Sequence, residues 1–189
     1  MYTITPYSNP HRTPYCWWED AFTAEELNYL QNKAKTATDV AAIDGGVNLN
    51  VRRSQTLWLD PEAEENKWLA QRLGHIVSSL NAKFYNFNLT GFGEAFQLTT
   101  YKSSEQGAYT WHQDCGGQIS RKLSLVLQLS DPSTYEGGNL QLLHGNTDLL
   151  PKKLGLIVAF PSWELHQVTP VTAGERHSLV CWVTGPEFR

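Results

Sequence analysis

Three things are scarce in this sequence: cysteine, long apolar runs and an excess of basic charge. The three cysteines, Cys16, Cys115 and Cys181, form no CxxC pair, and an odd set in a chain of this size does not build a disulfide scaffold. This cysteine usage favours a reducing compartment. No apolar run approaches the roughly 18 residues that span a bilayer, and residues 1–15 lack the apolar centre of a signal peptide. We therefore expect a soluble, cytoplasmic protein without a membrane partner.

The charge balance argues against nucleic acid as a partner. The formal net charge is -4 and the pI is about 5.8, so the chain has no overall basic field. The two short basic pairs are Arg52-Arg53 and Lys152-Lys153. No pattern in the sequence indicates the oligomeric state, which stays open.

Aromatic residues, by contrast, are plentiful. They make up 12% of the 189 residues, and such side chains favour strands that pack in a sheet. With 41% hydrophobic residues, the chain is large enough to bury a substantial core. We predict a single domain over residues 1–189, in which 1–94 supply supporting helices and outer strands and 95–185 form the β core.

Helical patterns lie in the first half of the chain. Thr23 begins the first helix as its cap, and Glu26 completes a capping box. Leu27, Leu30 and Ala34 recur at helical spacing and predict one apolar face. A second helix is predicted from about Glu62 to Phe84, with Asp60 as its cap. Between the two helices, residues 51–59 are predicted to form one strand.

From Glu94 onward the pattern changes to short strands separated by turn residues. Several short strands at this spacing predict a β-sandwich or jelly roll. The predicted strands are Ala95–Tyr101, Leu123–Leu129, Asn139–Leu143, Leu156–Phe160 and Ser178–Val183.

A His-x-Asp pair, His112 and Asp114, ends the segment YKSSEQGAYTWHQD. On an extended backbone these two side chains project to the same face. His166 lies 52 residues after Asp114 and can supply a third ligand. Two histidines and one carboxylate leave coordination positions open, as in non-heme Fe(II) oxygenases. The alternative is that His112 is a surface histidine before a turn and His166 a core histidine.

Arg176 and Ser178 are also two residues apart, on the last predicted strand. A guanidinium binds a carboxylate through two parallel hydrogen bonds, and a neighbouring hydroxyl can add a third. The pair therefore suits one end of a dicarboxylic acid. The alternative is a surface arginine paired with Glu175 or Glu187.

With these residues in place, residues 17–185 resemble the 2-oxoglutarate/Fe(II)-dependent dioxygenases, especially the prolyl 4-hydroxylase-like branch of short bacterial and phage hydroxylases. The matching residues run in the family's order through the second half of the chain: Phe96-Gln97, Tyr101, Gly107, Tyr109, Trp111–Asp114, Arg121–Ser124, Glu136–Leu140, Phe160–Ser162, His166, Val168, Pro170-Val171, Gly174, Arg176, Ser178 and Trp182.

The resemblance implies a double-stranded β-helix, the jelly-roll or cupin-like fold, with N-terminal helices. It also implies that Fe(II) is bound by the catalytic residues His112, Asp114 and His166. Contacts to the co-substrate 2-oxoglutarate are implied for Arg176, Ser178, Tyr101, Gln128 and Trp182. Gln128 departs from the animal prolyl hydroxylases, which carry a tyrosine at the comparable position. O2 is the second co-substrate that the resemblance implies.

The activity implied is hydroxylation of an unactivated C–H, on a prolyl or other residue of a protein or peptide. It is coupled to decarboxylation of 2-oxoglutarate to succinate and CO2. The location would be the host cytoplasm if the chain is phage-encoded. One alternative is a hydroxylase of a free amino acid or small metabolite; another is a non-catalytic metal-binding β-sandwich. Residues 44–50 and 102–108 are candidate lids, Arg52 and Arg53 are candidates to face the same cleft, and Cys115 is expected to be a buried, inert thiol.

Overall fold

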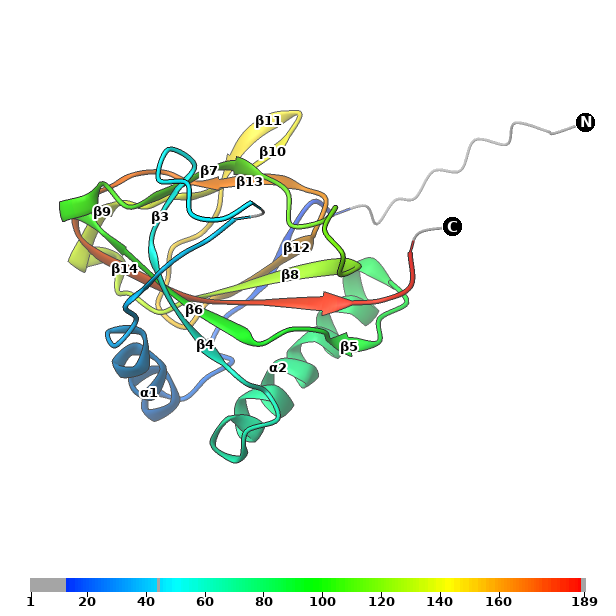
Figure 1. The fold of residues 1–189 in the computed structure, drawn as a ribbon. Helices are drawn as coiled ribbons and strands as arrows, with labels where there is room; N and C mark the ends of the chain where they lie inside the picture. Colours follow the sequence, from blue (N-terminus) through cyan, green and yellow to red (C-terminus); the bar gives the residue numbers. More distant parts are fainter. Residues whose placement is uncertain (1–12, 44, 188–189) are drawn as a thin grey trace, which may run out of the picture.

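Two facing β-sheets form the body of the protein in the computed structural model, which describes residues 13–43 and 45–187 (Figure 1). All strand pairs are antiparallel. The larger sheet runs in the order β1 (Cys16–Trp18), β12 (Ile157–Pro161), β8 (Arg121–Gln128), β14 (Val171–Thr184), β6 (Phe96–Lys102), β4 (Gln55–Leu59) and β2 (Asp39–Val40), with β5 (Gly91–Phe92) and β9 (Tyr135–Gly137) paired to β14.

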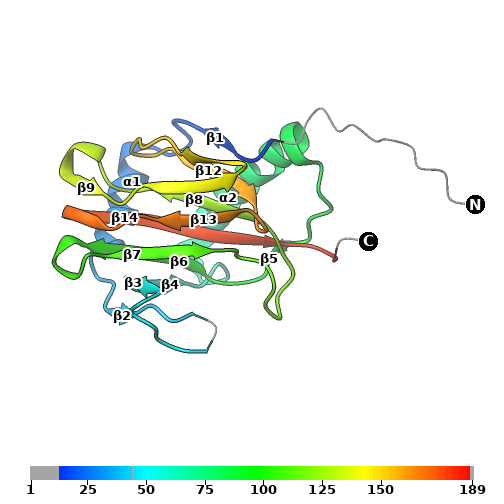
Figure 2. The ribbon, with the colours of Figure 1, turned by 90° about the horizontal axis from the view of Figure 1, so that it is seen from above.

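The smaller sheet lies across the inner face of the larger one, as the view from above shows (Figure 2). Its order is β11 (Asn146–Leu149), β10 (Leu140–His144), β13 (Leu165–Val168), β7 (Ala108–His112) and β3 (Arg52–Arg53). The predicted fold class, mainly β with supporting helices, is confirmed.

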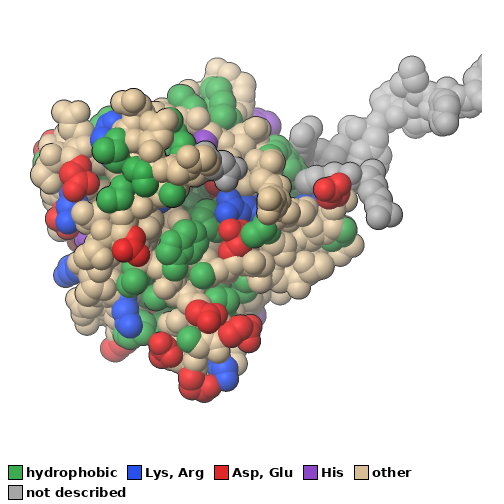
Figure 3. Space-filling model, viewed as in Figure 1, with side chains coloured by type: hydrophobic (Ala, Val, Ile, Leu, Met, Phe, Trp, Pro, Cys, Tyr) green, Lys and Arg blue, Asp and Glu red, His purple; other side chains and the backbone are tan. Residues whose placement is uncertain are grey.

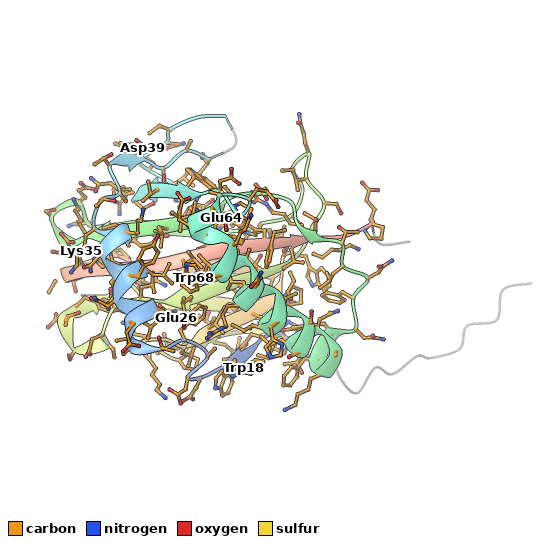
Figure 4. The ribbon with its side chains drawn as sticks, turned by 90° about the horizontal axis from the view of Figure 1, so that it is seen from below. Trp18, Glu26, Lys35, Asp39, Glu64 and Trp68 are labelled. Carbon is orange, nitrogen blue, oxygen red and sulfur yellow. The ribbon has the colours of Figure 1, made fainter. Side chains whose placement is uncertain are left out.

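Two helices, α1 (Ala24–Ala34) and α2 (Lys67–Leu80), cover the outer face of the larger sheet (Figure 4). Short helical turns are η1 (Glu64–Asn66), η2 (Asn81–Tyr85), η3 (Ser103–Glu105) and η4 (Pro132–Thr134). Among the described residues, neither helix has the length and apolar character that crossing a bilayer requires.

The first helix forms as predicted. The Thr23 hydroxyl accepts a hydrogen bond from the backbone N–H of Glu26, while the Glu26 carboxylate accepts one from the N–H of Thr23. This capping box satisfies two N–H groups that the first helical turn leaves without partners. Leu27, Leu30 and Ala34 form its buried face, as expected.

The second helix is shorter than predicted. The α-helix begins at Lys67 and not at Glu62, because the chain first makes the 3₁₀ turn η1, in which the Asn66 side chain donates to the Asp60 carbonyl. At the other end it ends at Leu80 and widens into the π turn η2, so that Phe84 is not in the α-helix.

The single strand predicted over residues 51–59 is wrong. The segment divides at Ser54 into β3, which pairs with β7, and β4, which pairs with β6. These partners belong to different sheets, so the chain crosses from the smaller sheet to the larger one at Ser54. Strand propensity alone cannot reveal this crossing because both halves are extended.

Alternation along the central strands separates two environments. Leu123, Leu125 and Leu127 of β8 face the helices and belong to the hydrophobic cluster there. Ser124 and Gln128, at the intervening positions, face the space between the sheets, as period-two geometry requires. The same rule turns polar side chains of β6 and β14 inward: Gln97, Tyr101, Arg176 and Ser178.

Gly174 lies in β14, two residues before Arg176. Its left-handed backbone conformation lets the strand pass close to the turn η4. Its φ is +67°, and an added Cβ would lie 2.2 Å from the Thr134 carbonyl oxygen. Gly145 is a matched comparison because its φ is +79° and nothing lies within 4 Å of an added Cβ.

We expect G145A to lower the free energy of unfolding by about 1–2 kcal/mol through backbone strain alone. G174A should lose about 1–3 kcal/mol more because of the clash. Equal losses in urea unfolding would contradict this account.

Candidate active site

Sheet pairing places the two predicted histidine ligands side by side. His112 ends β7, His166 lies in β13, and the two are directly opposite in the register. Asp114 follows His112, and its backbone N–H donates to the Ser162 carbonyl. The Nε2 atoms of His112 and His166 lie 3.7 and 3.6 Å from the Asp114 carboxylate oxygens. One ligand atom from each residue lies within 4.8 Å of the others.

Hydrogen bonds set the tautomer of each histidine. His112 Nδ1 lies 2.7 Å from the Thr110 carbonyl oxygen, and His166 Nδ1 lies 2.9 Å from the Glu164 carbonyl oxygen. A carbonyl only accepts, so each Nδ1 carries the proton and donates. Both Nε2 lone pairs are therefore directed toward Asp114, as metal ligation requires.

The pKa values favour the ligating protonation states. Burial, followed by the neighbouring His166, lowers the pKa of His112 to about 3, so its imidazole is neutral at pH 7. Burial alone would raise the pKa of Asp114. The two histidines and the Ser124 hydrogen bond outweigh burial and hold that pKa below its ordinary value. At pH 7 the group thus offers a neutral imidazole at His112 beside an ionised carboxylate at Asp114.

Side chains behind Asp114 fix its carboxylate. The Ser124 hydroxyl donates to Asp114 Oδ2 at 2.7 Å and lies 2.9 Å from the Ser162 hydroxyl. The indole N–H of Trp182 faces the same carboxylate and helps lower its pKa, although it makes no hydrogen bond of good geometry to a described residue. Sequence reasoning did not assign Ser124 a role; its inward position in the β8 alternation was the available signal.

Arg121 contacts both the backbone of Asp114 and the side chains of the cavity wall. Sequence reasoning did not identify it as a site residue. Its guanidinium pairs with both carboxylate oxygens of Glu94 at 2.5 Å and lies 4.0 Å from the Trp182 ring centroid. It also donates to the Asp114 carbonyl at 3.3 Å. Arg121 therefore orients the backbone that carries one ligand.

Arg176 is buried, with 1% of its surface exposed. Its guanidinium donates to the Ser178 hydroxyl at 3.3 Å and to the Gln128 amide oxygen at 3.1 Å, and it lies 5.4 Å from the Tyr101 ring centroid. Its Nε has no hydrogen-bond partner, and no described carboxylate pairs with it. The alternative of a surface arginine paired with Glu175 or Glu187 is wrong.

The three candidate metal ligands and Arg176 line one cavity of about 990 Å³ between the sheets. On the face drawn in Figure 3, the molecule is hollowed between the two layers, with hydrophobic side chains gathered beside the hollow. Tyr101, Ser178 and Trp182 line the cavity as well; Gln128 does not and contacts it through Arg176.

The cavity mouth differs in part from the sequence expectation. Residues 115–119 line it, and Cys115 among them is half-buried, whereas a buried, inert thiol was expected. Arg52 lines the cavity, but Arg53 turns away and donates to the carbonyls of Leu49, Glu105 and Gln106. Of the candidate lid residues, 45–50 and 102–108 do not line it, and Asp44 lies outside the described residues.

Comparison with known proteins agrees with this geometry. The sequence model of the 2OG-Fe(II) oxygenase superfamily matches residues 96–184, which carry all three candidate ligands and Arg176. A PKHD-type hydroxylase of Shewanella sp. (strain ANA-3) is 32% identical over 179 residues, covering 87% of this chain and 75% of the relative. The chain belongs to the 2OG-Fe(II) oxygenase superfamily.

Other relatives of this oxygenase cover less of the sequence or share only the fold. A PKHD-type hydroxylase of Synechococcus sp. (strain CC9605) is 33% identical, and the match spans 66% of this chain and 57% of that relative's length. A Pseudomonas putida prolyl-4-hydroxylase superposes with a TM-score of 0.73 at 23% identity, covering 90% of this chain and 92% of that one. The jelly-roll expectation is thereby confirmed.

A second similar structure is a prolyl hydroxylase from Trichoplax adhaerens in complex with a peptide fragment of the hypoxia inducible factor oxygen degradation domain. Its TM-score is 0.76 at 16% identity, and the match covers 91% of this chain and 84% of that one. These two superpositions show a prolyl 4-hydroxylase-like fold, and the sequence matches given above make the chain an enzyme of the oxygenase superfamily.

Family membership implies Fe(II) and 2-oxoglutarate, and the donor set fits the metal. Two ligand atoms that each lie about 2.1 Å from one ion are at most about 4.2 Å apart. The His112–Asp114 and His166–Asp114 separations of 3.7 and 3.6 Å satisfy this limit, and all three ligand atoms lie within 4.8 Å of one another. Two histidines and one carboxylate are also the ligand types of a facial triad.

Replacement of Ser124 tests how the Asp114 carboxylate is held. We expect S124A to weaken Fe(II) binding by about 10- to 100-fold, because such supporting contacts typically contribute that much to metal affinity. Anaerobic titration with Fe(II) measures the effect. S130A is the control, since Ser130 is also buried but bonds to the backbone of Glu175 and His177 outside the cavity. Wild-type Fe(II) affinity in S124A would contradict the assigned role.

Acidification should destabilise the metal-free enzyme through His112. The folded pKa is about 3, below the ordinary 6.5, so between these values the unfolded chain binds a proton that the folded chain does not. The stability from His112 is therefore complete above pH 6.5 and is lost as pH falls toward 3. Urea unfolding measures the free energy of unfolding at pH 7.5 and at pH 5. The decrease between these two pH values should be smaller in H112N than in wild type. Identical losses would show that His112 is not held neutral.

Proposed function

We propose that this oxygenase hydroxylates an unactivated C–H of a prolyl or other residue in a protein or peptide, with decarboxylation of 2-oxoglutarate to succinate and CO2. O2 is the oxidant in this proposal. The observation that carries it is the buried, unpaired Arg176 in the same cavity as His112, Asp114 and His166.

The metal part of the proposal rests on the donor set. His112, Asp114 and His166 would hold Fe(II), which when bound supplies the O2 and C–H chemistry. The backbone carbonyls behind both histidines keep Nε2 unprotonated toward the ion. The Ser124 hydroxyl keeps Asp114 turned toward the same point.

The co-substrate part rests on Arg176. Burying a guanidinium without an anion costs several kcal/mol, whereas a bound carboxylate neutralises the charge and satisfies the free N–H. The distal carboxylate of 2-oxoglutarate is such an anion. Ser178 and Gln128 hold the guanidinium in place, since both accept hydrogen bonds from it.

Two aromatic residues line the proposed site, Tyr101 beside Arg176 and Trp182 beside Asp114. Tyr101 contacts Arg176 through its ring face and lines the cavity, and its proposed role is to contact the co-substrate there. Trp182 forms the wall beside Asp114 and Arg121, and not beside Arg176. Its proposed role is therefore to exclude water from the metal side of the cavity.

The open cavity mouth supports a peptide substrate. Trp58 and Ile119 line it while 46% and 39% exposed, so both can contact a chain that enters. A similar fold from Trichoplax adhaerens binds a peptide fragment. A free amino acid or small metabolite is the second candidate, favoured by charge inside the cavity at Arg52. A non-catalytic binding module has no use for a buried carboxylate receptor.

The first test is anaerobic titration of the purified chain with Fe(II) and then 2-oxoglutarate, following the visible charge-transfer band of the chelate. We expect the band in wild type and its loss in H166A. R176A should keep Fe(II) binding but need about 30-fold more 2-oxoglutarate, because loss of a charged hydrogen-bonded contact costs about 2 kcal/mol.

R53Q is the matched control and should behave as wild type, since among the described residues Arg53 donates only to backbone carbonyls outside the cavity. An unchanged 2-oxoglutarate requirement in R176A would remove the carboxylate assignment. Fe(II) binding without any band in wild type would favour the non-catalytic module.

A further inference from the structure

A second buried guanidinium, that of Arg52, lies in the same cavity. Arg52 belongs to β3 of the smaller sheet, lines the cavity and is 6% exposed. No carboxylate among the residues that the structure describes pairs with it. It lies outside residues 96–184, the part that the family model covers.

The neutral partners of Arg52 repeat those of Arg176. Arg52 Nε donates to the Ser54 hydroxyl at 2.9 Å, its Nη2 donates to the Gln97 amide oxygen at 2.6 Å, and the guanidinium lies 4.7 Å from the Tyr109 ring centroid. Arg176 likewise contacts a serine two residues on, a glutamine from a neighbouring strand and a tyrosine ring. Within the described chain, Arg52 Nη1 donates to no residue.

Arg121 is a useful comparison because a carboxylate of the protein itself neutralises its charge. It lines the same cavity, and both carboxylate oxygens of Glu94 accept from it. Arg52 has only neutral acceptors, which orient the guanidinium without cancelling its charge. An uncompensated buried cation costs several kcal/mol, and an anionic ligand removes that cost.

The two unpaired guanidinium groups serve different ends of the cavity. Arg52 contacts Gln97, and Arg176 contacts Tyr101, four residues further along β6. Four residues of strand span about 13 Å. A co-substrate carboxylate on Arg176 therefore leaves Arg52 available to a second molecule.

We propose that Arg52, held by Ser54, Gln97 and Tyr109, binds a carboxylate of the primary substrate. The proposal rests on the function proposed above, and it names the substrate class: molecules that carry a carboxylate near the C–H to be hydroxylated. A carboxylate matches the planar fork of the guanidinium. It belongs either to a free amino acid or to an acidic side chain next to the reacting residue of a peptide.

Calorimetry under argon tests this with enzyme loaded with Fe(II) and 2-oxoglutarate. Two probe pairs separate the sources of the carboxylate: L-proline against L-prolinamide, and acetyl-Ala-Pro-Asp-amide against acetyl-Ala-Pro-Asn-amide. In at least one pair, we expect wild type to bind the carboxylate at least tenfold more tightly than its amide. The pair that shows the preference identifies the source.

R52Q should lose this preference, R52K should keep part of it because the charge remains without the fork, and R53Q should keep it all. The absence of a carboxylate preference in both pairs overturns the proposal. A preference that is unchanged in R52Q and R52K overturns it as well. The charge-transfer band distinguishes this failure from failure of the proposed function: a band in wild type with no carboxylate preference removes only the role of Arg52.

Discussion

Successive side chains on β6, β8 and β14 point to opposite faces of the larger sheet, and both the core and the cavity depend on this geometry. Leucines at one set of positions, such as Leu125 and Leu127, pack under α1 and α2. The intervening set, including Ser124 and Arg176, faces the space between the sheets. A shift of one residue in any of these strands would exchange the two sets, exposing leucines to the cavity and burying Arg176 under the helices. The hydrophobic packing of the helices therefore also fixes the register of the polar site.

The candidate metal group is assembled by the other sheet. Pairing of β7 with β13 sets His112 opposite His166, and the backbone N–H of Asp114 is tied to the Ser162 carbonyl. Hydrogen bonds to main-chain carbonyls then hold each imidazole in the tautomer that leaves Nε2 free. The larger sheet contributes the support for Asp114 through Ser124. The site is thus a contact between two layers, and any loosening of their packing would separate the ligands from the groups that orient them.

The sequence was sufficient for elements whose signals are local. The capping box at Thr23, the buried stripe of α1 and the grouping of His112 with Asp114 all follow from spacings of two to four residues. The resemblance implied His166 as the third ligand and Arg176 as a contact to the co-substrate, and the sheet register places His166 opposite His112 and Arg176 opposite Tyr101. Sequence reasoning failed where tertiary context decides: both halves of residues 51–59 are extended, so only the pairing partners reveal the crossing at Ser54. Ser124 and Arg121 were missed because their roles depend on neighbours far away in the chain.

The residues that line the cavity come from two separate parts of the sequence, and the crossing at Ser54 lies in the earlier part. One contiguous stretch, residues 96–184, carries the candidate ligands and the buried Arg176, whereas an earlier segment lines the same cavity with Ala42, Ile43, Arg52 and Trp58. That segment joins the two sheets at their edges, since β2 and β3 each end a sheet. Each of these edge strands pairs on one side only, β2 with β4 and β3 with β7. Substitutions in this earlier segment can therefore change the lining of the cavity while residues 96–184, which carry the candidate ligands and Arg176, keep their sequence.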